Sequence, residues 1–391
     1  MLTVAQRFWR SARLMPTRSF YFDRPLVLIQ SDDWGRAGVR DREGFEQLRS
    51  AGIELGQRPY DFYTLETADD VVALAGLLKR HRDSAGRPAC LEMNFVLANV
   101  DFQECAAHDF RQIYLRPLSD GLPGRWSRPG LFDAYAAGMR DGVFCPALHG
   151  ITHFCKPVAE YVLAKEGDRA ELLRTLWKAE TAYIHWRMPW IGYEYWSPEA
   201  HRNERFLSLR SQDQMINKAV TMFKTLFRTS PASACAPGYR ANEDTHRAWA
   251  QHGIRVAQNG PGFAPPRIDH HGILQVTRTI DFEPATNSCF SLENCLGAAE
   301  KCFSRGMPAV ISVHAVNFHS SLKDFRSRTL RLLDELLSVL EKKYPDLLYV
   351  HDADLWQIVN SGKFENAQGD VIVGVKQQGY RNRWLAIGRG A

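Results

Sequence analysis

The chain has 391 residues, of which 45% are hydrophobic and 24% charged, so it can bury a sizeable core and does not have the composition of a disordered chain. Its 49 Lys and Arg residues against 44 Asp and Glu residues leave a formal net charge of +5. The basic residues are scattered, whereas a dedicated nucleic-acid binder gathers them in a patch or stripe. We therefore expect no nucleic-acid partner.

The N-terminal segment, residues 1–19, is expected to lie outside the main domain. It contains basic residues but no apolar core of the length found in secretory signals. No run of about 18 apolar residues occurs in the chain, so no membrane span is predicted. The eight cysteines form no CxxC pair and are sparse for a disulfide scaffold. These features predict a cytoplasmic protein; an alternative interpretation of the segment is an amphipathic helix on a membrane surface, with Phe8 and Trp9 on its apolar side.

Short apolar runs alternate with longer helical patterns over residues 20–360. The predicted strands are residues 25–31, 90–98, 142–149, 253–259, 272–278, 308–314 and 347–352. The predicted helices are residues 67–83, 169–186, 212–227 and 328–344. This alternation predicts βα units with a parallel sheet, either open or closed into a barrel. Residues 361–391 are rich in glycine and are expected to form a tail or a small β appendage.

Candidate chemistry gathers where predicted strands end. The first strand runs into Asp32 and Asp33, the third into His149, and the sixth into His314. Parallel α/β folds place their sites at the carboxyl ends of strands. Two adjacent acids repel each other and need a positive partner when they leave water. The sequence therefore predicts a metal ion beside the two aspartates.

A second pair supports this interpretation. His149 and His153 are four residues apart, a spacing that brings two imidazoles to one side of a helix or tight loop. The zinc-protease pattern HExxH is excluded because Gly150 stands where that pattern needs glutamate. Two histidines and one carboxylate, with a position left for water, are a common catalytic zinc set. Zinc is the expected metal, with cobalt, nickel or manganese as alternatives.

These motifs resemble, in chain order, those of the polysaccharide deacetylase (NodB-homology) family of metal-dependent carbohydrate esterases. "SDDWG" resembles the family's aspartate motif, His149 and His153 its histidine pair, "CAPGYRAN" (235–242) its arginine–proline–aromatic turn, and "VISVHAVNFHSS" (310–321) its histidine-ending strand. The resemblance covers roughly residues 20–360. It implies an α/β fold, a distorted (β/α) barrel of about seven parallel strands.

The resemblance also implies a role for each matched residue. Asp33, His149 and His153 would bind the metal, and Asp32 would be the base that takes a proton from metal-bound water. The backbone N–H of Tyr239 would help to hold the tetrahedral oxyanion. His314 would protonate the departing amine, which suits an imidazole because it titrates near neutral pH.

The third motif departs from the family pattern. Cys235 stands where an arginine that pairs with the catalytic acid is expected, and we expect this cysteine to be buried and inert. Arg240 or Arg278 could substitute for that arginine. If neither reaches Asp32, the assignment of Asp32 as the base weakens.

Further residues near strand ends and in aromatic stretches are candidates for sugar binding. Amides can hydrogen-bond sugar hydroxyls and aromatic faces can stack on sugar rings, although Asn99 could instead form a turn and His319 could be a solvated loop residue. The aromatic stretch 177–196 is more typical of a core, but its Pro and Gly residues favour a loop that forms a lid or wall over the cleft. The candidates are Trp34, Asn94, Asn99, Trp190, Arg278, Asn317 and His319.

The sequence thus predicts a carbohydrate deacetylase that removes an acetyl group, with N-acetyl favoured, from an amino sugar in a glycan or glycan precursor by attack of metal-bound water. Its expected partner is an acetylated amino sugar, oligosaccharide or polysaccharide. One alternative is a glycoside hydrolase that uses paired carboxylates such as Asp32 and Glu283. Another is a catalytically silent carbohydrate-binding protein, which the missing arginine at position 235 favours.

Overall fold

The computed structural model describes residues 18–367 and 369–379. A twelve-stranded sheet dominates these residues, in the order β11-β12-β2-β3-β6-β7-β8-β10-β9-β1-β16, with β13 also paired to β2. The parallel strands are β2 (Leu26–Trp34), β3 (Leu91–Phe95), β6 (Phe144–Leu148), β7 (Ser233–Cys235), β8 (Val256–Pro261), β10 (Leu274–Arg278), β11 (Ile280–Asp281), β12 (Ala309–His314) and β13 (Leu348–Tyr349). The antiparallel strands at one edge are β9 (Arg267–Ile268), β1 (Arg18–Phe22) and β16 (Val375–Gly379).

The sheet curls into a barrel because one continuous stretch, β10 followed by β11, pairs with a strand at each end of the row of parallel strands. β10 pairs with β8, and after Thr279 the same chain continues as β11, which pairs with β12. The barrel is distorted at β6 and β7, where Leu148 and Ala234 form the only residue pair of that ladder. The predicted distorted (β/α) barrel is confirmed.

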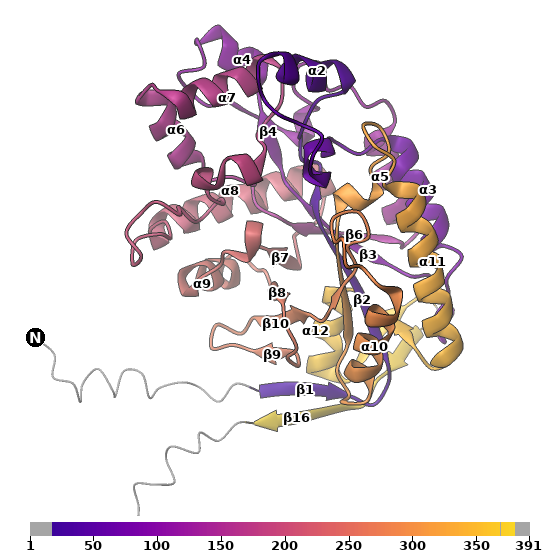
Figure 1. Cartoon of the computed structure of the whole chain (residues 1–391). Coiled ribbons are helices and arrows are strands. Elements are labelled where there is room, and N and C mark those ends of the chain that lie inside the picture. The colour runs from indigo at the N-terminus through magenta and orange to yellow at the C-terminus, as the bar shows by residue number, and fades with distance from the viewer. Residues whose placement is uncertain (1–17, 368, 380–391) are drawn as a thin grey trace, which may run out of the picture.

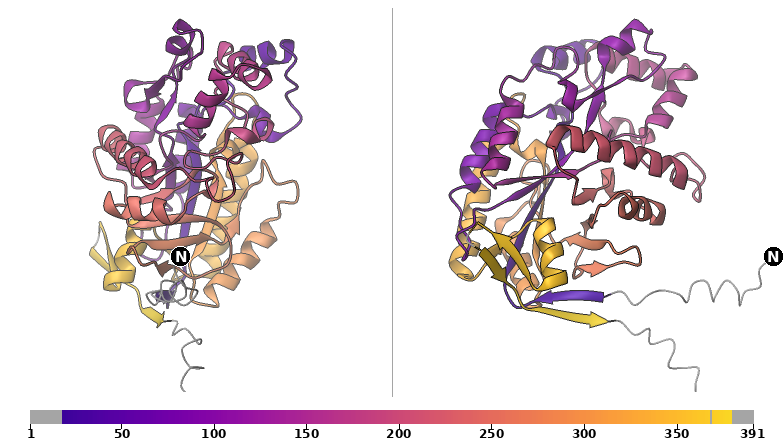
Figure 2. Two further views of the ribbon diagram at one scale, coloured as in Figure 1. Left: turned by 90° about the vertical axis from the view of Figure 1, so that its left-hand side faces the viewer. Right: turned by 180° about the vertical axis from the view of Figure 1, so that it is seen from behind.

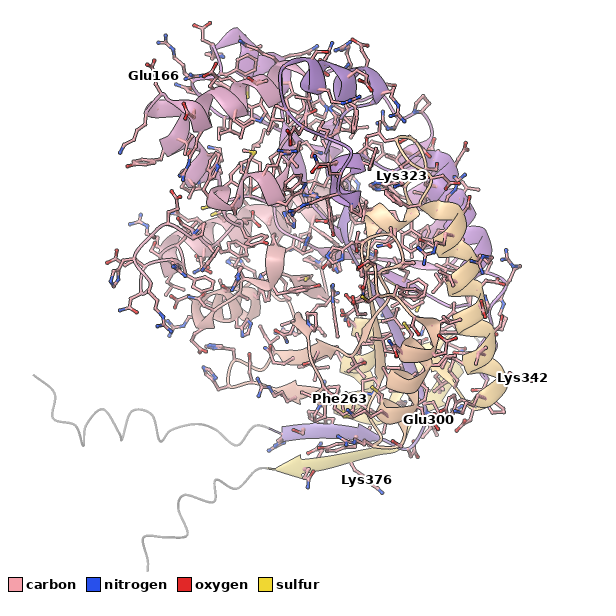
Figure 3. All side chains as sticks on the ribbon, in the orientation of Figure 1. Glu166, Phe263, Glu300, Lys323, Lys342 and Lys376 are labelled. Atoms are coloured by element: carbon pink, nitrogen blue, oxygen red, sulfur yellow. The ribbon has the colours of Figure 1, made fainter. Side chains whose placement is uncertain are left out.

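Helices cover the outside of the barrel, with α3 and α11 along one side and α8 and α9 on another (Figure 1). The helices are α2 (Arg42–Ser50), α3 (Ala68–Leu78), α4 (Phe102–Ala107), α5 (Leu131–Arg140), α6 (Lys156–Ala164), α7 (Asp168–Lys178), α8 (Leu209–Phe227), α9 (Glu243–Gln251), α10 (Leu292–Phe303), α11 (Arg326–Lys343) and α12 (Asp352–Ser361). Charged residues such as Glu166, Glu300 and Lys342 lie on the outer surface (Figure 3).

The barrel interior changes from apolar to polar along the strands. On β2, Val27 and Ile29 belong to the core beneath the helices, whereas Leu26 and Leu28 belong to a second cluster that contains Leu355 of α12. Because side chains alternate along a strand, Gln30 and then Asp32 continue the face of Leu26 and Leu28. The amino ends of the strands thus enclose an apolar plug, and the carboxyl ends carry polar side chains.

The two ends of the described chain meet in the main sheet, where β1 and β16 run side by side (Figure 2). Two further strands of the C-terminal region, β14 (Lys363–Asn366) and β15 (Gly369–Ile372), form a hairpin. The expected amphipathic helix falls on residues 1–17, outside the described residues, and the division at residues 20 and 360 stays a prediction. Of the helices in the described part of the chain, none combines the length and apolar character needed to cross a bilayer.

Candidate active site

A cavity of about 350 Å³ opens at the carboxyl ends of the barrel strands. Its lining includes Asp32, Asp33, His149, His153 and His314, which come from β2, β12 and the loop after β6. Residues from three distant parts of the sequence therefore share one space, as the strand-end rule predicts.

A break in the regular pleat lets both aspartates reach this cavity. Adjacent residues of a regular strand point to opposite faces. The pairing of β2 with β3 shifts register between Ser31 and Trp34, and Asp33 has a φ of +76°. Aspartate is among the residues that tolerate the left-handed region. This bulge turns Asp33 so that its carboxylate lines the cavity beside that of Asp32.

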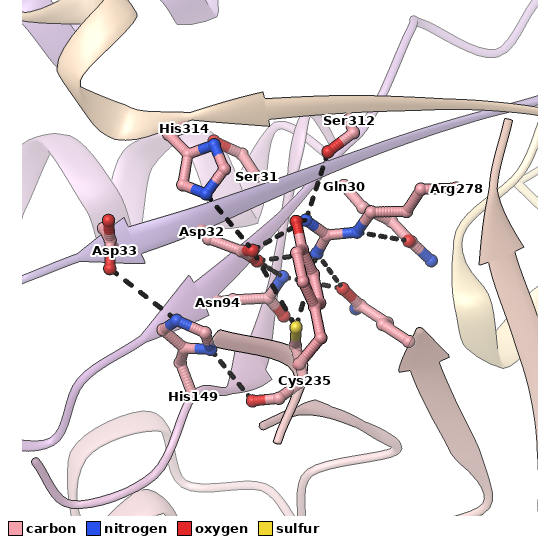
Figure 4. A network of polar contacts seen from close by, with 12 residues as sticks. Gln30, Ser31, Asp32, Asp33, Asn94, His149, Cys235, Arg278, Ser312 and His314 are labelled. Atoms are coloured by element: carbon pink, nitrogen blue, oxygen red, sulfur yellow. Dashed lines mark hydrogen bonds and ion pairs between the residues drawn. The ribbon is translucent and has the colours of Figure 1, made fainter. Parts of the chain in front are cut away.

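The two histidines of the loop after β6 each have one ring nitrogen anchored. Nδ1 of His149 lies 2.9 Å from the carbonyl oxygen of Cys235, and Nδ1 of His153 contacts the hydroxyl of Tyr183. Their Nε2 atoms consequently face Asp33, at 3.7 Å for His149 and 3.1 Å for His153 from Oδ1 (Figure 4 shows His149). Anchoring of the far ring nitrogen is typical of metal-binding histidines.

These three residues fit a divalent cation. Their ligand atoms lie within 4.8 Å of one another. Oδ1 of Asp33 and Nε2 of His149 are buried and have no hydrogen-bond partner, which costs free energy unless something else satisfies them. A cation would satisfy both.

A second cluster, formed by Asp32, His149 and Cys235, fits a cation less well although its ligand atoms also converge. Both carboxylate oxygens of Asp32 already accept hydrogen bonds from Arg278. Burial raises the pKa of the Cys235 thiol well above its usual value, and the charge of Asp32 raises it further. The thiolate form that binds metals is therefore disfavoured.

Arg36 supports the other side of the Asp33 carboxylate. Its Nη2 lies 3.3 Å from Oδ2 of Asp33, its Nη1 donates to the hydroxyl of Tyr183 at 2.8 Å, and its guanidinium lies 3.9 Å above the centre of the Tyr63 ring. Burial alone would raise the pKa of Asp33, but the charges of Arg36 and His153 hold it well below its usual value. Asp33 is therefore ionised, with Oδ1 turned toward the histidines.

Arg278 of β10 pairs with Asp32. Its Nη1 donates to Oδ2 and its Nη2 to Oδ1, both at 2.6 Å (Figure 4). Asn94 donates to Oδ1 at 2.7 Å and also to Gln258, which accepts from Arg278 as well. Burial opposes ionisation of Asp32, but the charge of Arg278 outweighs it and lowers the pKa. One of the two predicted substitutes for the missing arginine thus contacts Asp32.

His314 lies on the opposite side of Asp32 from Arg278 and is held by Glu283. Its Nδ1 lies 2.6 Å from Oε1 of Glu283 and its Nε2 lies 3.8 Å from Oδ2 of Asp32. Asn317 donates to Oε2 of Glu283 at 2.6 Å and fixes this carboxylate. Burial lowers the pKa of His314, but the charge of Glu283 and its hydrogen bond outweigh burial and raise it to about 9. His314 is therefore protonated at neutral pH.

Two other predicted catalytic groups lie differently from expectation. The backbone N–H of Tyr239 donates to the carbonyl of Ala236 at 2.8 Å, so in this conformation it is not offered to an oxyanion, and that role stays a prediction that requires this bond to open. Arg240 is exposed and stacks 4.5 Å from the centre of the Trp196 ring, and its predicted catalytic role finds no support in the contacts of its side chain.

The predicted sugar-binding residues do not line the cavity. Most are buried behind it: Trp34 donates to Ser31 in the core, Asn99 bonds the backbone of Gly35 and Ala37, and His319 lies 3.5 Å from Glu66. Asn94, Arg278 and Asn317 contact Asp32 or Glu283 instead, and Trp190 is buried beneath Arg169. The polar residues among them hold the site from behind, because side chains near a strand end can face the barrel wall as readily as the cavity.

Sequence reasoning missed most of the residues that form the cavity wall. Arg36 follows the aspartate motif directly, and most of the other wall residues are aromatic. We call this set the aromatic collar; it consists of Tyr60, Tyr63, Tyr183, Trp186, Tyr193 and Tyr239. Three of its members come from the stretch 177–196, so the prediction of a wall there agrees with their position, while Tyr60 and Tyr63 had no signal beyond a dense aromatic run.

The sequence matches no protein-family model, and no curated protein matches it. Solved structures with a similar fold include a protein from Parabacteroides distasonis assigned as a glycoside hydrolase/deacetylase, 11% identical, covering 89% of this chain and 74% of its own, with a TM-score of 0.49. A protein from Mycobacterium smegmatis assigned as a polysaccharide deacetylase is 10% identical and covers 89% and 96%, with a TM-score of 0.44. A family 4 carbohydrate esterase from Streptomyces lividans in complex with acetate is 12% identical and covers 83% and 90%, with a TM-score of 0.34.

Proposed function

We propose that the chain is a metal-dependent hydrolase that removes an acetyl group, with N-acetyl favoured, from an amino sugar in a glycan or glycan precursor. The observation that carries the proposal is the meeting of two sets of side chains in one cavity. Asp33, His149 and His153 present buried ligand atoms, two of them unsatisfied, beside the ionised Asp32 and the protonated His314.

Asp33, His149 and His153 would hold the cation, with zinc favoured because two imidazoles, one carboxylate and an open position suit it. When bound, a divalent cation supplies Lewis acidity, polarising a carbonyl oxygen and making water more acidic. Arg36 and Tyr183 keep the ligands oriented from behind, since they contact Asp33 and His153 directly.

Asp32 would accept the proton of the attacking water. Arg278 and Asn94 fix its carboxylate and keep it ionised, so its oxygens are present in the unprotonated, accepting form at neutral pH. His314 would donate the proton at Nε2 to the departing nitrogen. An amine is a poor leaving group unless protonated, and an imidazole held protonated at neutral pH meets that need. This is why removal of an N-acetyl group is favoured.

The contacts of Glu283 and Arg278 remove the features that favoured the glycoside hydrolase and the silent binding protein. A glycoside hydrolase that pairs Asp32 with Glu283 needs both carboxylates at the substrate, but Glu283 does not line the cavity and is engaged by His314 and Asn317. A silent binding protein was suggested by the absent arginine at position 235, whose place at Asp32 is taken by Arg278.

The test is release of acetate from a panel of N- and O-acetylated amino sugars, before and after chelation and with added zinc, cobalt, nickel or manganese. The proposal expects acetate release that a chelator abolishes and a metal restores. Asp33→Asn should remove it, while Asp213→Asn, at a surface carboxylate that pairs only with His252 among the contacts described, is the matched control. Reducing sugar without acetate, or no acetate with any metal, would refute the proposal.

A further inference from the structure

The cavity is bounded by an aromatic wall whose parts are tied to one another. Its volume of about 350 Å³ lies near the lower end of the range of about 300–1,000 Å³ that small-molecule sites occupy. An internal residue of a polysaccharide needs a groove that is open at both ends, because the chain enters on one side of the reacting ring and leaves on the other. Such a polymer would fit only if the wall left two openings.

Trp186 joins two wall segments that are far apart in the sequence. Its indole N–H donates to Oδ1 of Asp61 at 2.9 Å, and Asp61 sits in the 3₁₀ helix η1 (Pro59–Phe62) between Tyr60 and Tyr63 of the aromatic collar. Trp186, Tyr60 and Tyr63 all line the cavity. The link therefore connects the two segments where both face the substrate space.

This link is held on both sides. The guanidinium groups of Arg58 and Arg187 lie 4.1 and 4.2 Å from the centre of the Trp186 ring, positions typical of cation–π contacts. The other oxygen of Asp61 accepts backbone N–H bonds from Gly56, Gln57 and Arg58 at 2.9–3.0 Å. Passing a polymer between Tyr60 and Trp186 would break a buried, multiply bonded carboxylate contact.

The wall continues at two other points. Tyr193 packs so closely on Gly238 that a Cβ atom at position 238 would lie 2.4 Å from its ring. Tyr60 meets His314 edge to face, with ring centres 6.4 Å apart. The collar thus contacts the turn at Gly238 on one side and the proposed acid His314 on the other, and these contacts favour a pocket over an open groove.

We infer that this pocket admits one sugar ring with a single attachment, so that the proposed deacetylase acts on free or chain-terminal acetylated amino sugars and not on internal residues of a polysaccharide. The inference rests on the proposed function. The faces of the collar would stack on that ring, and its attachment to a carrier would leave through the open side of the pocket.

The test uses the metal-loaded full chain with N-acetylglucosamine, N-acetylgalactosamine and N-acetylmannosamine as monosaccharides and with defined oligomers of N-acetylglucosamine. Mass-spectrometric sequencing of the products locates each lost acetyl group. We expect loss from one terminal residue only, at a rate per chain that does not increase with chain length. Loss from internal residues at comparable rates overturns the inference and leaves the proposed function standing; no acetate from any substrate overturns both.

Variants of the link provide the second arm. Trp186→Ala should raise the ratio of internal to terminal acetate release at least tenfold, because it removes the tie to Asp61, and Trp186→Phe, which keeps an aromatic ring but loses the N–H, should raise it less. Tyr161→Ala, at an exposed tyrosine outside the cavity lining, is the control and should keep the ratio of the unmodified chain. A ratio unchanged in both Trp186 variants, with folding verified by circular dichroism, contradicts the inference.

Discussion

Arg278 and Asp32 form a two-pronged ion pair inside the barrel, with both N–O distances 2.6 Å and the Arg278 side chain fully buried. The arginine comes from β10, whereas the family resemblance places the corresponding arginine at position 235 of the β7 turn. An arginine from a different strand, separated from β7 by β8 in the sheet, thus contacts this carboxylate. The charge of Asp32, and with it the proposed catalytic base, depends on this pair.

Replacement of Arg278 tests that dependence. Arg278→Met should lower the free energy of unfolding by about 3–5 kcal/mol, because it leaves a buried carboxylate without its partner. Urea denaturation measures the change. Arg240→Met, at the exposed arginine over Trp196, should change it by less than about 0.5 kcal/mol.

The sign of the pH dependence distinguishes loss of the ion pair with Asp32 from simple loss of packing in the Arg278→Met variant. The pKa of Asp32 is lowered in the folded protein, so the pair contributes stability that is present above the unfolded pKa and is lost as pH falls through the folded one. In Arg278→Met, burial dominates and raises the pKa of Asp32. The stability deficit of the variant should therefore grow between pH 4 and pH 8; a deficit that is constant with pH contradicts this account.

The proposed acid gives a second pH prediction. Because the pKa of His314 is raised to about 9 in the folded protein, kcat/KM should stay high through neutral pH and fall as pH rises past about 9. Glu283→Gln removes the charge that raises this pKa, so the falling limb should move toward the ordinary imidazole value of about 6.5. Steady-state rates between pH 6 and pH 10 measure the falling limb in the unmodified chain and in Glu283→Gln. A limb that stays in place in Glu283→Gln would remove His314 from the role of acid.

The raised pKa of His314 also makes the stability of the folded protein depend on pH. A histidine whose pKa is raised by folding contributes stability that is fully present below its unfolded pKa, near 6.5, and disappears as pH rises through about 9. Thermal unfolding of the unmodified chain should therefore show a decline in Tm across that window. Glu283→Gln should flatten the decline, and an equal decline in both proteins would assign it to other groups.

Metal binding should depend on the loop after β6. His153→Ala removes one of the three converging ligand atoms, so the metal bound per chain and the rise in Tm on addition of zinc should both be lost. Elemental analysis and thermal unfolding measure these quantities. His252→Ala, which removes an imidazole that pairs with Asp213 at the surface, should keep both. Full metal retention in His153→Ala would place the cation elsewhere.

Cys235 should be dispensable for chemistry. Burial and the nearby charge of Asp32 raise the pKa of its thiol, so it stays protonated at neutral pH and does not act as a nucleophile. Cys235→Ala should keep kcat within about threefold of the unmodified chain, a change of about 0.7 kcal/mol in the barrier. Incubation with iodoacetamide, which reaches the exposed Cys289, should leave activity intact. Loss of activity in parallel with labelling of Cys235 would contradict this assignment.

The three converging side chains of the candidate metal site and the barrel strands follow local sequence patterns, because each is encoded by residues close together in the chain. The apolar runs 25–31 and 308–314 correspond to β2 and β12, and both end at the cavity. By contrast, β7 spans only three residues, Ser233–Cys235, too few to show a pattern in the sequence. Predicted helix 169–186 ends at Lys178, where the chain turns to build the cavity wall.

The joining of the two aromatic segments of the cavity wall could not be predicted, because it depends on a contact between residues far apart in the sequence. No pattern near Asp61 indicates that it will accept a hydrogen bond from Trp186. Asn94, near the end of β3, and Asn99, in the short strand Ala98–Val100 after it, were candidate substrate ligands, yet Asn94 donates to Asp32 and Asn99 bonds the backbone at Gly35. The bulge that turns Asp33 toward the cavity is likewise set by pairing with β3, which the sequence of β2 does not reveal.

The most direct measurement is a crystal structure of the chain soaked with zinc, with the ion located by its anomalous scattering. The account predicts one strong peak about 2.0–2.2 Å from Oδ1 of Asp33 and from Nε2 of both His149 and His153. A peak bound instead by Asp32 and Cys235, or no peak in the cavity at zinc concentrations that support acetate release, would contradict it.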